Sequence, residues 1–223
     1  MTLKVIAYAR NGHTDKFGIP RQSREESPIV TRIVFEPEYR VPEALRGIEG
    51  YSHLWLIWGF SEVDSWSPTV RPPRLGGNIR MGVFATRSPF RPNPLGLSSV
   101  RLLGIENGEL IVSGADLMDG TPIYDIKPYL SFSDSHSDAV NGFAEQTKGY
   151  RLRVTGYGIT ESSDAGVPEK TMRDIIYILS QDPRPAYQND PERVYKMDYA
   201  GYTVSFSVNK QTVLVKKIEK KQK

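Results

Sequence analysis

Short runs rich in valine, isoleucine, leucine and aromatic residues dominate the first 135 residues, and Gly, Pro, Asn or charged residues bound each run. One short helix is predicted among them, at Pro42–Arg46, where a proline begins the segment. Because strands do not alternate with helices here, a doubly wound α/β fold is disfavoured. We therefore expect a mainly β fold, an antiparallel sheet closed into a barrel. The expected strands are Leu3–Ala9, Pro28–Glu36, His53–Phe60, Met81–Ala85, Leu97–Leu103 and Glu109–Ser113.

The pattern changes in the last third of the chain. A polar stretch, Ser131–Lys148, predicts a linker or surface excursion. Apolar residues then recur at helical spacing in Pro168–Gln181, which predicts an amphipathic helix. Three strands are expected after it, around Val194–Tyr199, Tyr202–Val208 and Thr212–Ile218. We thus predict two domains, a barrel over residues 1–135 and a small α+β domain over residues 149–223.

Composition narrows the class of protein. The chain has 223 residues, 39% of them hydrophobic and 25% charged, which is ordinary for a globular protein with a core. It contains no cysteine, which excludes disulfides and thiolate metal sites, and its three histidines are not closely spaced. No stretch is long and apolar enough to cross a membrane, and the first residues do not resemble a secretory signal. We expect a cytosolic protein that holds no metal and does not contact a membrane.

Charge is distributed unevenly. Between Ser65 and Ile105 there are six arginines but no lysine, aspartate or glutamate, and prolines and glycines are interleaved with them. Arginine suits carboxylates, phosphates and nucleobase edges, and proline and glycine shape loops, so this segment predicts the wall of a site for an anionic or nucleotide-like ligand. The alternative is a solvated basic face without a ligand. Five lysines among the last eight residues fit either nucleic-acid contact or a solubilising tail.

A second block, from Asp116 to Tyr129, gathers groups that can handle protons. It holds Asp116, Asp119 and Asp125, followed by Lys127 and Tyr129. The alternative is an ordinary Asp-Gly turn leading into a strand that ends at a proline. Neither a G-x-G-x-x-G fingerprint after the first strand nor a P-loop motif is present, which excludes the common dinucleotide and P-loop classes.

Several strings together resemble one family, the TsaA-like (YaeB, TrmO) proteins, in both parts of the chain and in the family's order. They are Ser-His-Leu-Trp, Arg-Pro-Pro-Arg-Leu-Gly-Gly-Asn, Gly-Val-Phe-Ala-Thr-Arg-Ser-Pro-Phe-Arg-Pro-Asn-Pro, Asp-Gly-Thr-Pro, Asp-Ile-Lys-Pro-Tyr and Asp-Pro-Arg-Pro-Ala-Tyr. The resemblance implies an S-adenosylmethionine-dependent tRNA methyltransferase that methylates N6 of threonylcarbamoyl-adenosine next to the anticodon. It further implies a single-sheeted antiparallel β-barrel that binds the cofactor, a small α+β C-terminal domain, and a homodimer.

Site residues follow from the same resemblance, position by position. At Ser61 many relatives have histidine, so a backbone contact is expected there, and the region between Ser131 and Gly166 is shorter than in the family. The residues implied for the cofactor are Pro20, Arg21, Gln22, Phe60, Ser61, Arg87, Leu97, Leu117, Met118, Asp119 and Gly120. Those expected along the phosphates of the tRNA anticodon loop are Arg71, Arg74, Arg80 and Arg184, with the C-terminal lysines.

For the reaction itself we hypothesise three catalytic residues: Asp125, Lys127 and Tyr129. They would orient the base and handle the N6 proton, with Asp125 as the acceptor. The alternative is that alignment and desolvation suffice and the proton passes to water. Two rival functions stay open on sequence: a methyltransferase for small molecules on the same barrel, and a non-catalytic sensor that binds the cofactor or RNA.

Overall fold

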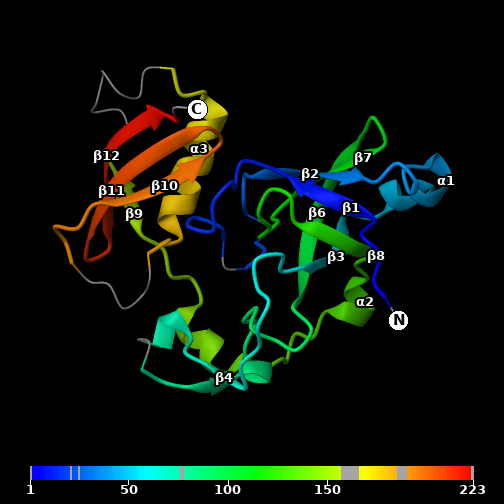
Figure 1. The fold of residues 1–223 in the computed structure, drawn as a ribbon, viewed down its shortest axis with the longest axis horizontal. Coiled ribbons are helices and arrows are strands. Elements are labelled where there is room, and N and C mark those ends of the chain that lie inside the picture. Colours follow the sequence, from blue (N-terminus) through cyan, green and yellow to red (C-terminus); the bar gives the residue numbers. More distant parts are fainter. Residues whose placement is uncertain are drawn as a thin grey trace.

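Six strands form a closed barrel, and a smaller α+β unit lies beside it (Figure 1). Every neighbouring pair in the barrel is antiparallel, in the order β1-β2-β7-β6-β3-β8. The predicted single-sheeted antiparallel barrel is therefore confirmed. Its strands are β1 (Ala7–Arg10), β2 (Val30–Phe35), β3 (His53–Gly59), β6 (Leu95–Glu106), β7 (Glu109–Ser113) and β8 (Pro122–Pro128). The structure, a computed structural model, describes residues 2–20, 22–24, 26–75, 78–156, 166–184 and 190–221.

Alternating burial explains why these segments are strands. Along β3 the side chains of Leu54 and Leu56 are fully buried, whereas their neighbours His53 and Trp55 are only half-buried. A strand places successive side chains on opposite faces, so one set fills the barrel and the other faces outward. The inward set packs with residues such as Ile33, Val100 and others from every strand into one hydrophobic core.

The excursion between β3 and β6 differs from the prediction. Met81–Ala85 is not a barrel strand: only β5 (Met81–Gly82) is extended, it pairs with β4 (Thr69–Val70), and Val83–Ala85 is the 3-10 helix η3. The barrel position falls to β8 instead. Proline and glycine set the local path, and Arg91 braces it by donating from Nη1 to the carbonyl of Thr86, at 2.7 Å. A further 3-10 helix, η2 (Pro73–Leu75), lies on the same excursion.

Short helices fill the other connections. The predicted helix at Pro42–Arg46 is present as α1 (Pro42–Leu45), followed by the 3-10 helix η1 (Ile48–Gly50). The polar stretch predicted as a linker contains α2 (Ser131–Asp134) and the 3-10 helix η4 (Gly142–Thr147). Helix α2 is tied to the barrel because the indole Nε1 of Trp55 donates to Asp134, at 2.7 Å.

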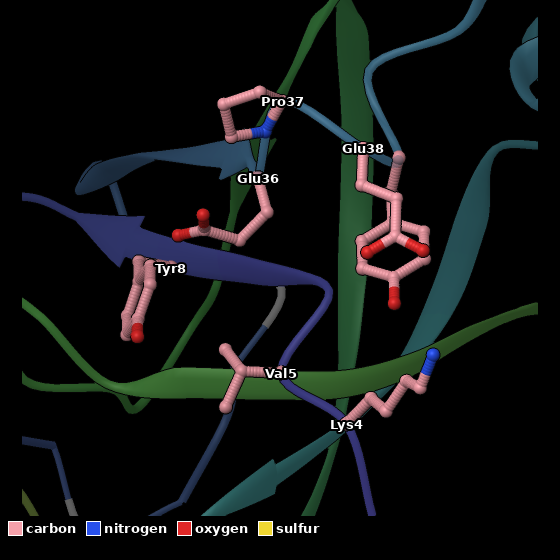
Figure 2. A pocket seen from close by; sticks show the side chains of 7 residues that line it. Lys4, Val5, Tyr8, Glu36, Pro37 and Glu38 are labelled. Atoms are coloured by element: carbon pink, nitrogen blue, oxygen red, sulfur yellow. The ribbon is translucent and has the colours of Figure 1, made fainter.

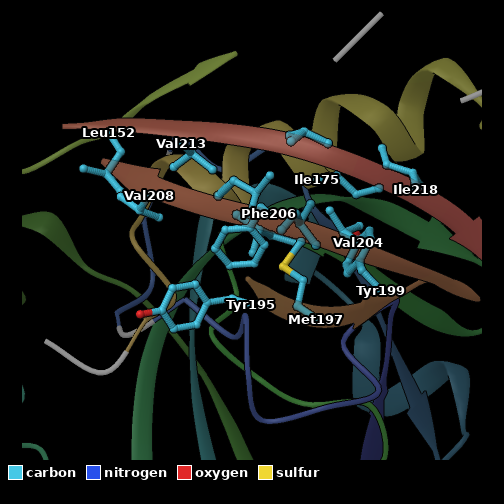
Figure 3. Close-up of a cluster of buried hydrophobic side chains, with 14 residues drawn as sticks. Leu152, Ile175, Tyr195, Met197, Tyr199, Val204, Phe206, Val208, Val213 and Ile218 are labelled. Atoms are coloured by element: carbon cyan, nitrogen blue, oxygen red, sulfur yellow. The ribbon is translucent and has the colours of Figure 1, made fainter. Parts of the chain in front are cut away.

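The C-terminal unit packs the helix α3 (Glu169–Ser180) against a four-stranded sheet, and Figure 3 shows the side chains buried there. Phe206 lies in this core with Ile175 of the helix. The three predicted strands are present, but a fourth, which pairs parallel with β12, was not predicted. The strands are β9 (Arg153–Thr155), β10 (Tyr195–Tyr199), β11 (Tyr202–Asn209) and β12 (Thr212–Lys220).

The connection between β1 and β2 joins the two units. Ile29 is fully buried in the C-terminal core, and the ring of Phe17 stacks on Tyr195 with centroids 6.5 Å apart. The backbone of Gly12 passes so close to Tyr199 that an added Cβ would lie 2.7 Å from its ring. Phe17 and Ile29 therefore belong to the C-terminal core, although they lie between two barrel strands in the sequence. In the part of the chain that the structure describes, no helix is long and apolar enough to cross a membrane.

Candidate active site

Three connections meet at one end of the barrel. They are the β1–β2 connection, the β3–β6 excursion and the β7–β8 turn, and the antiparallel order brings all three to the same end. This end carries nearly every residue that the sequence analysis assigned to the cofactor. In chain order they are Pro20, Gln22, Phe60, Ser61, Arg87, Leu117, Met118, Asp119 and Gly120, with Leu97 near the start of β6; Arg21 lies outside the described residues.

A buried chain of hydrogen bonds links these connections. The indole Nε1 of Trp58 donates to Ser98 Oγ at 2.9 Å, and that hydroxyl donates to a carboxylate oxygen of Asp116. The backbone N–H of Ser23 donates to the same carboxylate. Gly96 makes the arrangement possible, because a Cβ there would lie 2.2 Å from Trp58 Cε2. Hydrogen bonds to Asp116, on the β7–β8 turn, thus link strands β3 and β6 with the β1–β2 connection.

Burial and the neighbouring polar groups act on Asp116 in opposite directions. Burial raises the pKa of Asp116, and the hydrogen bond from Ser98 and the nearby charge of Arg87 oppose that rise. The guanidinium of Arg87 is exposed and donates from Nη1 to Gln22 Oε1, at 2.6 Å. We call these five residues, Trp58, Ser98, Asp116, Arg87 and Gln22, the Asp116 junction. An exposed guanidinium whose orientation is fixed by a hydrogen bond to Gln22 is suited to binding an anionic group.

The other predicted cofactor residues have different surroundings. Leu117 is fully buried in the barrel core, so only its backbone is available to a ligand. Asp119 is engaged by the backbone N–H of Asn11 at 3.0 Å and by Arg10 at 3.6 Å. The ring of Phe60 lies edge-on to Trp58, with centroids 4.4 Å apart. Pro20 is buried, whereas Ser61 and Leu97 are exposed.

The three predicted catalytic residues lie along the outer face of β8. Lys127 Nζ is 2.8 Å from Asp125, and both side chains reach solvent. Tyr129 directly follows β8, and its backbone N–H donates to the carbonyl of His53 at the start of β3, at 3.0 Å. Its ring packs beside Trp55, with centroids 5.4 Å apart, and beside His53. The structure therefore brings Asp125 and Lys127 together and places Tyr129 in an aromatic cluster.

The arginines predicted to contact tRNA divide into two groups. Arg71 and Arg80 are exposed on the β3–β6 excursion, where Arg80 Nη1 donates to Thr69 Oγ1 at 3.1 Å. Arg74 belongs to η2, and its side chain lies outside the described residues. Arg184 is buried on the C-terminal unit, and Asp182 accepts two hydrogen bonds from it, at 2.8 and 3.0 Å. That pairing raises the pKa of Arg184, and a phosphate contact would require the pair to open.

Asp116, Ser98 and Trp58 are not among the site residues predicted from the sequence. Asp116 was recognised only as one of several acids in a block. Its position directly before Leu117–Gly120, residues already assigned to the cofactor, was an available signal. Nothing in the local sequence marks Ser98 apart from Ser99, because the difference between them is which face of β6 each occupies.

A hollow of about 610 Å³ opens elsewhere on the barrel (Figure 2). Lys4, Val5 and Tyr8 line one side, and Glu36 and Glu38 contribute carboxylates to it. None of the described residues assigned to the site lines it, and its two acids suit an anionic ligand poorly. Among the described residues, no group of three His, Asp or Glu side chains could hold a metal.

Comparison with known proteins agrees across both parts of the chain. Residues 8–135 match the family model of the tRNA-methyltransferase O N-terminal domain, and residues 161–221 match that of the TrmO C-terminal domain. A protein of Eikenella corrodens named tRNA (adenine(37)-N6)-methyltransferase is 48% identical over 173 residues, which are 75% of this chain and 97% of the relative.

Two further similarities bear on the fold and on the cofactor. The crystal structure of TrmO from Pseudomonas aeruginosa superposes with a TM-score of 0.78 at 31% identity, covering 98% of each chain. A protein of Archaeoglobus fulgidus named "Probable S-adenosyl-L-methionine-binding protein" is 36% identical over 144 residues, 65% of this chain and 38% of the relative. The chain, matched by both domain models in order, belongs to the TrmO family.

Proposed function

We propose that this protein is an S-adenosylmethionine-dependent tRNA methyltransferase that methylates N6 of the adenine at position 37. The observation that carries the proposal is the match of both TrmO domains in order, over residues 8–135 and 161–221. The threonylcarbamoyl form of that adenine, next to the anticodon, is the proposed substrate. Residues 1–135 would bind the cofactor, and residues 149–223 would contact the tRNA in the cytosol.

The residues at the barrel end fit S-adenosylmethionine chemically. The cofactor has one anionic group, its amino-acid carboxylate, and Arg87 is an exposed guanidinium that can receive it. Aromatic and apolar side chains, Phe60 and Leu97, offer surfaces for the adenine. Backbone groups of the β7–β8 turn and of the Pro20–Gln22 segment complete the proposed site. When bound, the cofactor supplies the activated methyl group.

On the outer face of β8, Asp125 would accept the proton that leaves N6. That nitrogen belongs to a urea-like group whose lone pair is delocalised, so removing its proton during attack makes it a better nucleophile. Lys127, at 2.8 Å, holds the Asp125 carboxylate in place. Tyr129, beside Trp55, offers an aromatic face on which an unstacked base of the anticodon loop can lie.

Arginines of the β3–β6 excursion and of the C-terminal unit would follow the phosphates of the loop. Arg71 and Arg80 are exposed, which supports this role, and Arg74 and Arg184 complete the proposed track. Such binding weakens steeply as salt rises, because each phosphate contact releases counterions.

A homodimer is part of the proposal. Large apolar side chains are exposed at two places outside the barrel strands, Phe84 in η3 at 75% exposure and Phe132 in α2 at 87%. Patches of this kind mark protein interfaces, and a second copy of the chain would cover them. Light scattering should give twice the mass of one chain, and the double variant Phe84→Ser/Phe132→Ser should give the mass of one.

The central test is methyl transfer from labelled S-adenosylmethionine to tRNA with and without threonylcarbamoyl-adenosine, followed by mass analysis of nucleosides. A new N6-methyl group on the modified tRNA alone would establish reaction and substrate together. Transfer to small molecules only, or cofactor binding without transfer, would replace the proposal with one of the two rival functions.

A further inference from the structure

Asp116 is held by donors from separate parts of the chain. Ser98 on β6 donates to it from inside the barrel, and the backbone of Ser23 donates from the β1–β2 connection. The charge of Arg87, from the β3–β6 excursion, also acts on it. Asp116 lies on the β7–β8 turn, and it interacts with a residue from each of the other two connections of the proposed site.

Burying the Asp116 carboxylate costs free energy, and the barrel could form without a carboxylate at this position. Desolvation of a carboxylate is unfavourable, and an apolar residue of similar size would usually stabilise a core at least as well. The neighbouring positions Ala115 and Leu117 are apolar and buried, so the turn can fill the barrel without an acid. The charge of Asp116 therefore has a use outside the packing of the core.

We infer that Asp116 is a positioning residue that holds Arg87 and Gln22 in the orientation that receives the carboxylate of the cofactor. The inference rests on the proposed function and deepens it. Ser23, bonded to Asp116, directly follows Gln22, and Gln22 Oε1 accepts from Arg87 at 2.6 Å. Fixing Ser23 fixes that amide, and the negative charge of Asp116 keeps the guanidinium from turning away into solvent.

Two ligands separate this role from a general structural one. S-adenosylhomocysteine carries the amino-acid carboxylate, whereas methylthioadenosine keeps the nucleoside and the sulfur without it. We expect Asp116→Asn to weaken S-adenosylhomocysteine binding about tenfold, the effect of one charged contact. Methylthioadenosine should bind within about twofold of wild type, because that ligand does not reach Arg87. Equal losses for both ligands, or no loss for either, would overturn the inference.

A double-mutant cycle tests whether Asp116 acts through Arg87. Arg87→Met alone should give the same selective loss, and adding Asp116→Asn to it should weaken binding no further. Because Arg87 is exposed, this variant should fold even if Asp116→Asn does not. In that event Asp116→Ser replaces Asp116→Asn in the cycle, and additive losses of Asp116→Ser and Arg87→Met would overturn the inference.

Kinetics and a control complete the experiment. A positioning role predicts a raised KM for the cofactor with kcat nearly unchanged at saturation. Glu109→Gln is the matched control, because Glu109 is also a partly buried barrel carboxylate that accepts from an arginine, Arg32, at 2.9 Å. It should change neither ligand's affinity. If the wild-type protein binds neither ligand, the proposed cofactor site itself fails; if it binds both and Asp116→Asn does too, only the positioning role fails.

Discussion

The barrel end and the outer face of β8 use carboxylates in opposite ways. Asp116, at the end, is desolvated, is bonded to a hydroxyl and a backbone N–H, and reaches the surface only in part. Asp125, on the outer face, has one ion pair with Lys127 and 46% of its side chain exposed. A buried acid with several partners fixes what surrounds it, whereas an exposed acid stays available to a visiting substrate. Substitutions on the two sides should therefore fail in different ways.

The largest expected effect is on the buried side, from Gly96→Ala. The new Cβ would overlap the rigid indole of Trp58, at 2.2 Å from Cε2. We expect a loss of about 3 kcal/mol in the free energy of unfolding, typical of overpacking, as measured by urea denaturation. Gly50→Ala is the control, because an added Cβ there meets nothing within 4 Å, and it should be nearly neutral. Equal effects of the two variants would show that Trp58 is not fixed as described.

The next largest effect is expected from Ser98, compared with its neighbour Ser99. Ser98→Ala leaves both the Trp58 N–H and the Asp116 carboxylate short of a partner inside the protein. We expect a loss of about 2 kcal/mol in unfolding free energy, the cost of an unsatisfied buried group. Ser99→Ala, on the outer face of the same strand opposite Trp55, should cost far less. The buried network would lose its importance if the two alanine variants were equally stable.

The pH dependence of stability should have opposite signs for Asp116, at the barrel end, and for Asp134, on α2. Burial raises the pKa of Asp116, so the stability this group contributes is present below its unfolded-state pKa and is lost as pH rises through the higher folded value. On the outer side, hydrogen bonds from the Leu130 backbone and from Trp55 lower the pKa of Asp134. Its contribution is present above the unfolded-state pKa and is lost as pH falls through the lower folded value.

Asparagine variants isolate these contributions. Relative to Asp116→Asn, the wild-type protein should lose stability as pH rises from about 4 toward neutrality, the range above the ordinary aspartate pKa. Relative to Asp134→Asn, it should lose stability as pH falls below that same ordinary value. Thermal melts across this range measure both differences, and slopes of the same sign would contradict the assignment of the two environments.

The smallest effect on stability is expected at Asp125. Removing an exposed ion pair should change the free energy of unfolding by less than about 1 kcal/mol, so Asp125→Asn should melt nearly as the wild type does. Its turnover on tRNA should nevertheless fall about 100-fold while cofactor binding is retained, because general bases contribute on that scale. Unchanged turnover would remove Asp125 from the proposed mechanism.

Local sequence was sufficient for five of the six barrel strands, and β8 was not among the expected ones. In His53–Gly59 the apolar run predicts the strand but not its inward face, because Leu54 to Trp58 are all apolar. Met81–Ala85 misled the prediction, because its apolar residues serve a short ribbon and a 3-10 helix on a proline-rich excursion. Strand β9 was missed because three residues carry little pattern, and their parallel pairing with β12 depends on contacts distant in the sequence.

The candidate site was predictable only in part for a related reason. The resemblance placed most of the cofactor residues on connections that the fold brings to one end of the barrel. Local sequence could not show that Arg184 turns inward to Asp182, or that Asp116 alone among the acids of its block becomes desolvated. Both outcomes depend on which side chains approach from other segments, and single-sequence patterns do not contain that information.

The shared β1–β2 connection has a consequence for how the protein is made. During synthesis Phe17 and Ile29 leave the ribosome long before residues that pack in the same core, such as Phe206 and Ile218, have been made. The first strand must likewise wait for β8 before the barrel closes. Contacts of such high sequence separation form slowly, so these apolar side chains stay exposed to chaperones, and to other nascent chains, until β11 and β12 have emerged.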